Sequence, residues 1–139
     1  NRMYEINYWA VLVASLFPMV IGSLWYGPLF GKRWMALVEK TEEELRANFN
    51  PVKSYAVTWG FALLMAFVMA HVIDTWSFRF GDLGVMGGIQ TGFWIWVGFV
   101  LTIGWQRVAF EDVKTALWTM NSLYNLITLM AMGVLLAIW

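Results

Sequence analysis

Uncharged polar and aromatic residues stand in the middle of long apolar stretches of this sequence, where they could bind a ligand or join helices. Asn121 and Asn125 are four residues apart, so they share one face of a helix. Trp94 and Trp96 each carry an indole N–H that needs an acceptor in apolar surroundings. These types can form hydrogen bonds but cannot donate or take up a proton near neutral pH. The chemistry they favour is therefore recognition rather than acid–base catalysis.

Pro18 adds a second polar feature, because proline lacks the backbone N–H that would bond the Ala14 carbonyl in a helix. Counted from the ends of their stretches, Trp96 and Asn125 are both about ten residues deep, or about 15 Å. We therefore expect a polar centre built from the Ala14 carbonyl, Trp94 or Trp96, and Asn125. Hydrogen bonds between helices, worth about 0.6 to 2 kcal/mol each, are the favoured interpretation, and a binding or conduction site is the alternative.

His71 and Asp74 are the other candidates for chemistry, since a spacing of three places them on one helical face. Two such residues are too few to hold a metal ion, and a single histidine cannot supply both axial ligands of a haem. The chain has no cysteine, no nucleophile-elbow serine and no phosphate-binding loop. We therefore predict no metal, no cofactor and no enzymatic activity. The least favoured alternative is an enzyme that acts on a lipid or quinone through this pair.

Three glycines recur every four residues at Gly84, Gly88 and Gly92, and Trp96 continues their line. Such a stripe lets a second helix approach closely. We predict helix packing here, either within the chain or across a dimer. A groove that holds a lipid or a flat ligand against Trp96 is the alternative.

The elements that must position these residues follow from where the charges lie. All eighteen charged residues fall outside four windows, residues 6–31, 54–73, 83–106 and 115–139, each at least 20 residues long. Because about 20 apolar residues cross a bilayer as a helix, the sequence predicts an all-α protein with a single domain of four transmembrane helices. The predicted spans are about 6–30, 54–73, 84–105 and 115–138. Ile21-Gly22 and Ile103-Gly104 occupy similar places, so two hairpins of like orientation remain an option.

The basic residues predict the orientation, because they concentrate on the cytoplasmic side of membrane proteins. Seven lie in the connections after the first and third spans, whereas only Arg2 and Arg79 lie on the other side. Both termini should face outward, and the inner membrane of a bacterium is the expected location. Within the connector, residues 32–53, the capping-box spacing of Thr41 and Glu44 predicts a short helix over residues 41–49. Several aromatic residues should form a belt at the inner interface: Trp25, Tyr26, Trp34, Tyr55, Trp59, Trp105 and Trp118.

The stretch LWYGPLFGKRWM, residues 24–35, is similar to a motif of the membrane family called domain of unknown function 1761. In that family a Trp-Tyr pair, a proline, Phe-Gly-Lys and Trp-Met close the first span. Phe110-Glu111, followed by Asn121 and Gly133, resembles a second motif of the family. The resemblance implies a small integral membrane protein with four helices and transfers no functional residue.

Two functions compete on these grounds. The leading prediction is a non-enzymatic membrane protein that acts by helix packing, as a homo-oligomer or an accessory subunit of a larger complex, with membrane lipids around it. The alternative is a small channel or carrier for an uncharged or amphipathic solute. No carboxylate or basic residue lies deep within a span, which disfavours proton- or sodium-coupled transport. A net charge of zero gives no reason to expect a nucleic-acid partner.

Overall fold

The computed structural model describes residues 5–139, and all the regular structure in this part of the chain is helical. Four helical stretches are long and apolar enough to cross a membrane: Tyr8–Leu29, Pro51–Phe80, Gly84–Phe110 and Thr115–Ile138. The predicted all-α fold with four spans is confirmed. The predicted orientation is not tested by the fold, and Arg2, which entered that argument, lies outside the described residues.

The first span is a chain of short helices, α1 (Tyr8–Ala14), α2 (Phe17–Leu24) and the π-helical turn η1 (Trp25–Leu29), and α3 (Gly31–Val38) follows it. Asn7 begins α1, because its side-chain oxygen accepts hydrogen bonds from the backbone N–H groups of Trp9 and Ala10. Pro18, at the start of α2, interrupts the helix as expected, and the break falls at Ser15 and Leu16.

The connector contains α4 (Glu42–Ala47), which begins where the Thr41 hydroxyl accepts from the Glu44 N–H, as the capping box predicts. It ends two residues earlier than expected. The second span, α5 (Pro51–Phe80), is longer than the predicted 54–73, because Asn50 caps it before the charge-free window and Gly81, with φ of 83°, ends it after that window. Its 30 residues extend about 45 Å, so both ends project beyond an apolar layer of about 30 Å.

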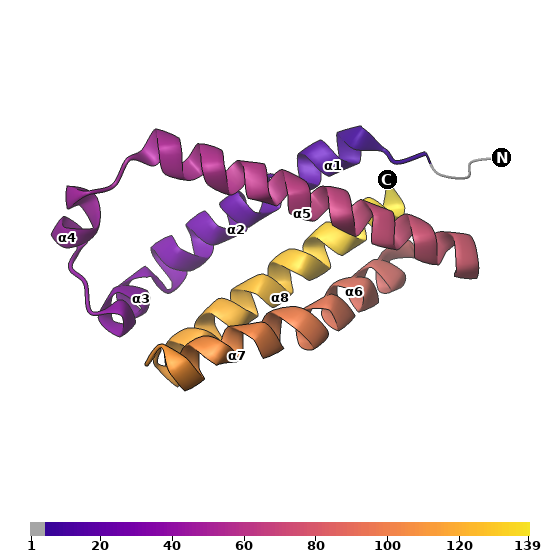
Figure 1. Cartoon of the computed structure of the whole chain (residues 1–139). Helices are drawn as coiled ribbons and strands as arrows, with labels where there is room; N and C mark the ends of the chain where they lie inside the picture. The colour runs from indigo at the N-terminus through magenta and orange to yellow at the C-terminus, as the bar shows by residue number, and fades with distance from the viewer. Residues whose placement is uncertain (1–4) are drawn as a thin grey trace.

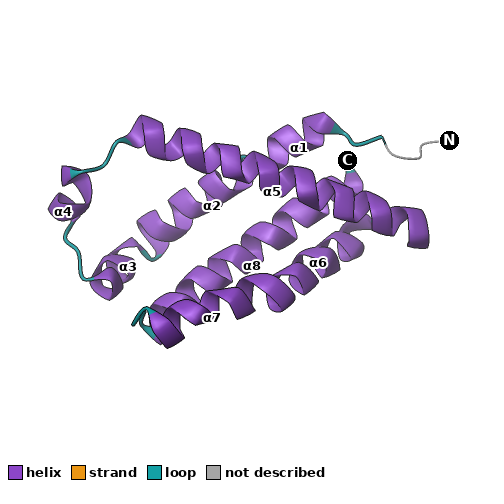
Figure 2. Ribbon diagram, in the orientation of Figure 1, coloured by secondary structure: helices purple, strands orange, loops and turns teal. Residues whose placement is uncertain are grey.

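The third span comprises α6 (Gly84–Ile95), the π-helical turn η2 (Trp96–Val100) and α7 (Leu101–Phe110), and the fourth is α8 (Thr115–Ile138). In Figures 1 and 2 the third and fourth spans run side by side as a close hairpin. By contrast, α2 and α5 contact each other little and diverge toward α4 (Figure 1). The hairpin of the first and second spans therefore runs in the same direction as that of the third and fourth spans, but its helices pack less closely.

We call the end of the bundle that carries α3, α4 and the turn from α7 to α8 the connector end. The opposite end, with residue 139 and the turn from α5 to α6, is the terminal end (Figure 1). The core lies between α1, α5, α6 and α8, with Ala14, Ala66 and Met132 fully enclosed. Because α8 packs against both α5 and α6, it is the central helix of the bundle.

Two of the three stripe glycines face α8. A Cβ on Gly88 would lie 2.5 Å from the Gly133 carbonyl oxygen, and one on Gly92 would lie 2.6 Å from the Leu129 carbonyl oxygen. Gly84 differs from the expectation, because it has φ of 62° and nothing lies within 4 Å of its Cβ position. It begins the helix after a turn rather than packing against a neighbour. The close approach at the other two positions is made within one chain.

Candidate functional site

The polar centre expected from Trp94, Trp96 and Asn125 does not form. The Trp96 indole N–H donates to the Ser122 backbone carbonyl at 2.7 Å, not to the Asn125 side chain. The Trp94 side chain points away from the bundle and is 59% exposed. Side chains two positions apart in an α-helix point about 200° away from each other, so the indoles of Trp94 and Trp96 face different neighbours. The sequence predicted the depth of Trp96 and Asn125 in the membrane, but their contacts depend on the direction in which each side chain points from its helix.

Trp59, which the sequence indicated only as a member of the interfacial belt, forms a hydrogen bond at the break before Pro18. The Trp59 indole N–H donates to the Ser15 hydroxyl at 3.0 Å, and that hydroxyl in turn donates to the Leu12 carbonyl. This bond joins the first and second spans where the helix is interrupted. The side-chain link at the break is thus made through Ser15 and not through the Ala14 carbonyl.

Two tyrosines join the first span to the fourth. The Tyr26 hydroxyl donates to the Asn121 side-chain oxygen at 2.6 Å, and the Tyr124 hydroxyl donates to the Pro18 carbonyl at 2.6 Å. Their rings meet edge to face, with centroids 5.2 Å apart. Gly22 leaves room for this arrangement, since a Cβ there would lie 3.2 Å from the Tyr124 hydroxyl oxygen. Pro18 and Asn121 therefore belong to one cluster, in which Tyr124 and Tyr26 form the connecting hydrogen bonds.

The π-helical turn η1 directs Tyr26 toward α8. The Phe30 N–H bonds to the Trp25 carbonyl five residues before it, and Gly27 has the non-helical angles φ −107° and ψ −105°. A Cβ on Gly31 would lie only 2.7 Å from the Tyr26 carbonyl oxygen, so the chain can turn this tightly only without a side chain there. The glycines and Pro28 thus form a turn that holds Tyr26 at the connector end.

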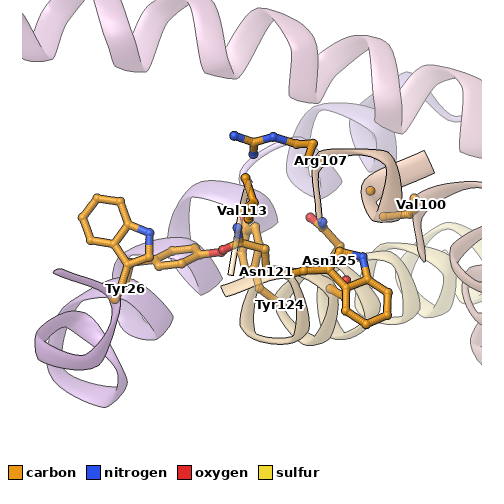
Figure 3. A pocket seen from close by; sticks show the side chains of 11 residues that line it. Tyr26, Val100, Arg107, Val113, Asn121, Tyr124 and Asn125 are labelled. Carbon is orange, nitrogen blue, oxygen red and sulfur yellow. The ribbon is translucent and has the colours of Figure 1, made fainter. Parts of the chain in front are cut away.

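Beside these tyrosines lies a cavity of about 380 Å³, which we call the amide pocket (Figure 3). Figure 3 shows Tyr26 reaching toward Asn121 from the first span, with Val100 and Arg107 on the opposite side. The pocket extends from Arg107 and Val113, beside the turn after α7, to Asn125, ten residues into α8. Its polar and aromatic lining comes from α3, α7, α8 and η1: Tyr26, Trp34, Arg107, Trp118, Asn121, Ser122, Tyr124 and Asn125.

Several groups in this pocket lack a hydrogen-bond partner in the described part of the chain. The Trp118 indole N–H is buried and unpaired. The Asn125 amide forms no hydrogen bond, and the Asn121 amide uses only its oxygen, for Tyr26. Polar groups that face an apolar environment normally find partners, so unpaired amide and indole groups at one cavity favour a site that a ligand completes.

A second hollow of about 680 Å³ lies between α2 and the first turns of α5, and we call it the tyrosine groove. Pro18, Ser54, Tyr55 and Thr58 contribute to its wall. Tyr26, Trp34 and Tyr124 line both the groove and the amide pocket. These three aromatic side chains therefore form the partition between the two hollows.

His71 and Asp74 do not act as a pair. No hydrogen bond joins them in the described structure, and they line different hollows. The exposed His71 ring meets Phe67 edge to face at 4.5 Å, whereas Asp74 faces a depression at the terminal end. A spacing of three residues leaves about 60° between two side chains, which is enough to separate them here. Within residues 5–139, no three His, Asp or Glu side chains gather as metal ligands would.

The family model for a protein of unknown function, DUF1761, matches residues 9–137, nearly the whole chain. The chain belongs to the DUF1761 family. The family resemblance of the sequence is therefore confirmed, together with its implication of a four-helix membrane protein. No curated protein and no solved structure matches the chain significantly.

The DUF1761 motif at residues 24–35 has a definite place in this fold, because it forms η1 and the start of α3. It supplies Tyr26 and Trp34 to both hollows. The sequence indicated Tyr26, Trp34 and Trp118 only as members of an interfacial belt. Tyr124 was not singled out at all. The Gly-Pro turn directly after Tyr26 was the available signal, since a turn inside a span redirects the side chains beside it.

Proposed function

We propose that this DUF1761 member is a non-enzymatic membrane protein that binds an amphipathic solute at the connector end and carries it across the bilayer. The amide pocket is the binding site, and the tyrosine groove, behind the aromatic partition, is the adjoining space. The observation that carries the proposal is the pair of incompletely bonded amides that line one cavity, Asn121 and Asn125, next to the buried, unpaired indole N–H of Trp118.

The position of the pocket suits an amphipathic molecule. Asn125 is about 15 Å along α8 from its start, near the middle of the apolar layer, whereas Arg107 is 58% exposed at the pocket mouth. A molecule with a polar head and an apolar body would match this gradient. In the proposed orientation, set by the seven basic side chains, the mouth faces the cytoplasm and the inner membrane of a bacterium is the location.

Flux of a fluorescent single-chain lipid tests the carrier function. In proteoliposomes that contain an NBD-labelled lysolipid, external dithionite reduces the label only in the outer leaflet. We expect the inner-leaflet label to move outward and be reduced faster than in protein-free vesicles. Asn125→Leu removes a polar group from the pocket and should slow this protein-dependent rate about 3- to 30-fold, as loss of a membrane hydrogen bond of 0.6 to 2 kcal/mol predicts. Thr119→Val, on the exposed face of the same helix, should leave the rate unchanged. A wild-type rate equal to that of empty vesicles would refute the carrier function.

Association with other chains is the second candidate, as a homo-oligomer or an accessory subunit. Its support is the third span, where only 17% of the most apolar window is buried within the chain. Gly88 and Gly92 do not support it, because α8 of the same chain occupies their face. Native mass spectrometry of the protein released from mild detergent is the test. A defined multimer or a stoichiometric partner is the expected result, and a bare monomer would exclude this candidate.

A further inference from the structure

The amide pocket offers more hydrogen-bond donors than acceptors. An indole N–H can only donate, and the Trp118 N–H is buried without a partner. The oxygen of Asn121 is taken by Tyr26, so its NH2 group is what remains for a ligand. The ligand that completes such a wall must therefore accept several hydrogen bonds.

A positive charge stands at the mouth of this wall. Arg107 uses its Nε to donate to the Glu111 carboxylate at 3.0 Å, which leaves both terminal nitrogens of the guanidinium free. Those nitrogens match the oxygens of a phosphate or carboxylate. Glu111 offsets part of the charge, but both side chains are more than half exposed and their pairing is weak.

The remainder of the wall is apolar and runs into the membrane. Val100 and Gly104 lie along the α7 side, and a Cβ on Gly104 would come within 3.3 Å of the Trp118 indole nitrogen. The Trp118 indole nitrogen is therefore enclosed at the wall beside Gly104 rather than exposed in the pocket. An oxyanion held between Arg107 and Asn121 would leave its attached chain directed past Val100 toward the depth of Asn125.

We propose that the amide pocket binds the oxyanion headgroup, phosphate or carboxylate, of a single-chain amphipath. Arg107 and Asn121 donate to the headgroup, the Trp118 ring forms the wall beside it, and Asn125 contacts an uncharged polar group farther along the molecule. This inference rests on the proposed function, because it names the class of solute that the same site takes.

Binding is measured by NMR of ¹⁵N-labelled protein in phosphatidylcholine nanodiscs, where each tryptophan gives one indole signal. Trp118→Phe assigns the Trp118 signal, and the signal of Trp9 at the terminal end serves as an internal reference. The probes are dodecyl phosphate, dodecanoate, dodecanol and inorganic phosphate. We expect a saturable shift of the Trp118 signal with dodecyl phosphate or dodecanoate, at concentrations where dodecanol and inorganic phosphate have no effect.

Variants test the named donors. Arg107→Gln should weaken binding of the anionic probe about 10-fold or more, because a charge-assisted hydrogen bond is lost. Arg33→Gln, an exposed basic residue of the same end that does not line the pocket, should change it little. Equal losses in the two variants would mean general attraction to a basic surface and would overturn the proposal. If Arg107→Gln does not fold, the probe series on the wild-type protein still decides.

The probe series separates the two proposals. Equal shifts with dodecanol and dodecyl phosphate would overturn the oxyanion inference while an amphipath site remains. Saturation by inorganic phosphate at the same concentration would show that the alkyl chain does not contribute to binding. It would overturn the assignment of an amphipathic ligand. No shift with any probe would refute both the inference and the proposed binding function.

Discussion

The hydroxyl of Tyr26 joins the first span to the fourth, through its hydrogen bond to Asn121. We expect Tyr26→Phe to lower the free energy of unfolding by about 0.6 to 2 kcal/mol, the range for a hydrogen bond between membrane helices. It should also free the Asn121 amide oxygen toward the pocket. Denaturation in mixed micelles measures the loss, and Tyr55→Phe, at an exposed tyrosine that also lines the groove, is the control. Equal stabilities of the two variants would mean that the bond contributes nothing.

The Lys114 ammonium lies 2.9 Å from the Glu39 carboxylate, and this hydrogen bond holds the pKa of Glu39 below its ordinary value of 4.5. Since the folded pKa is the lower one, the stabilising contribution is present above the ordinary pKa and disappears as the pH falls through the folded value. We expect Lys114→Gln to return the pKa of Glu39 to its ordinary range, measured by carboxyl ¹³C NMR. Lys40→Gln should leave it low, and an unchanged pKa in Lys114→Gln would contradict the assignment.

At the scale of elements, helix periodicity indicated which residues share a face but not which neighbour that face meets. The spacing of Gly88 and Gly92 predicted close packing and left its partner open, and α8 of the same chain is that partner in the structure. The spacing of His71 and Asp74 suggested a pair that does not form. The contact of Tyr26 with α8 was not predicted, because a π-helical turn shifts the register of side chains and a regular helical period does not include such a shift.

The contact between α6 and α8 can be tested at one position. In Gly92→Ala, the added methyl group would lie 2.6 Å from the Leu129 carbonyl oxygen, so the two helices must separate. We expect the free energy of unfolding to fall by about 1 to 3 kcal/mol, which is typical of overpacking. The oligomeric state should be the same as that of the wild-type protein. Gly98→Ala is the matched control, since nothing lies within 4 Å of its Cβ position. A tolerated Gly92→Ala would mean that the helices are not closely packed.

At the scale of the whole molecule, charge segregation was sufficient to predict four spans, because a charge is costly in the interior of the apolar layer and tolerated near its interfaces. The same reasoning placed the second span too narrowly, since α5 continues past Lys53 and Arg79 into the interfacial layers. The amide pocket was beyond reach from the sequence. Its polar and aromatic lining comes from four elements, and their relative rotation depends on the break at Pro18 and the turn at Gly27.

The proposed direction of binding depends on which end of the bundle faces the cytoplasm, and this can be measured directly. Because the chain has no cysteine, a single Glu43→Cys on α4 reports one site without background. We expect a membrane-impermeant maleimide added to intact spheroplasts to leave this cysteine unlabelled, and to label it once the membrane is permeabilised. Asp82→Cys, in the turn after α5 at the terminal end, should react in intact cells. The reverse pattern would place the mouth of the amide pocket on the outer face, so the solute would enter from outside the cell.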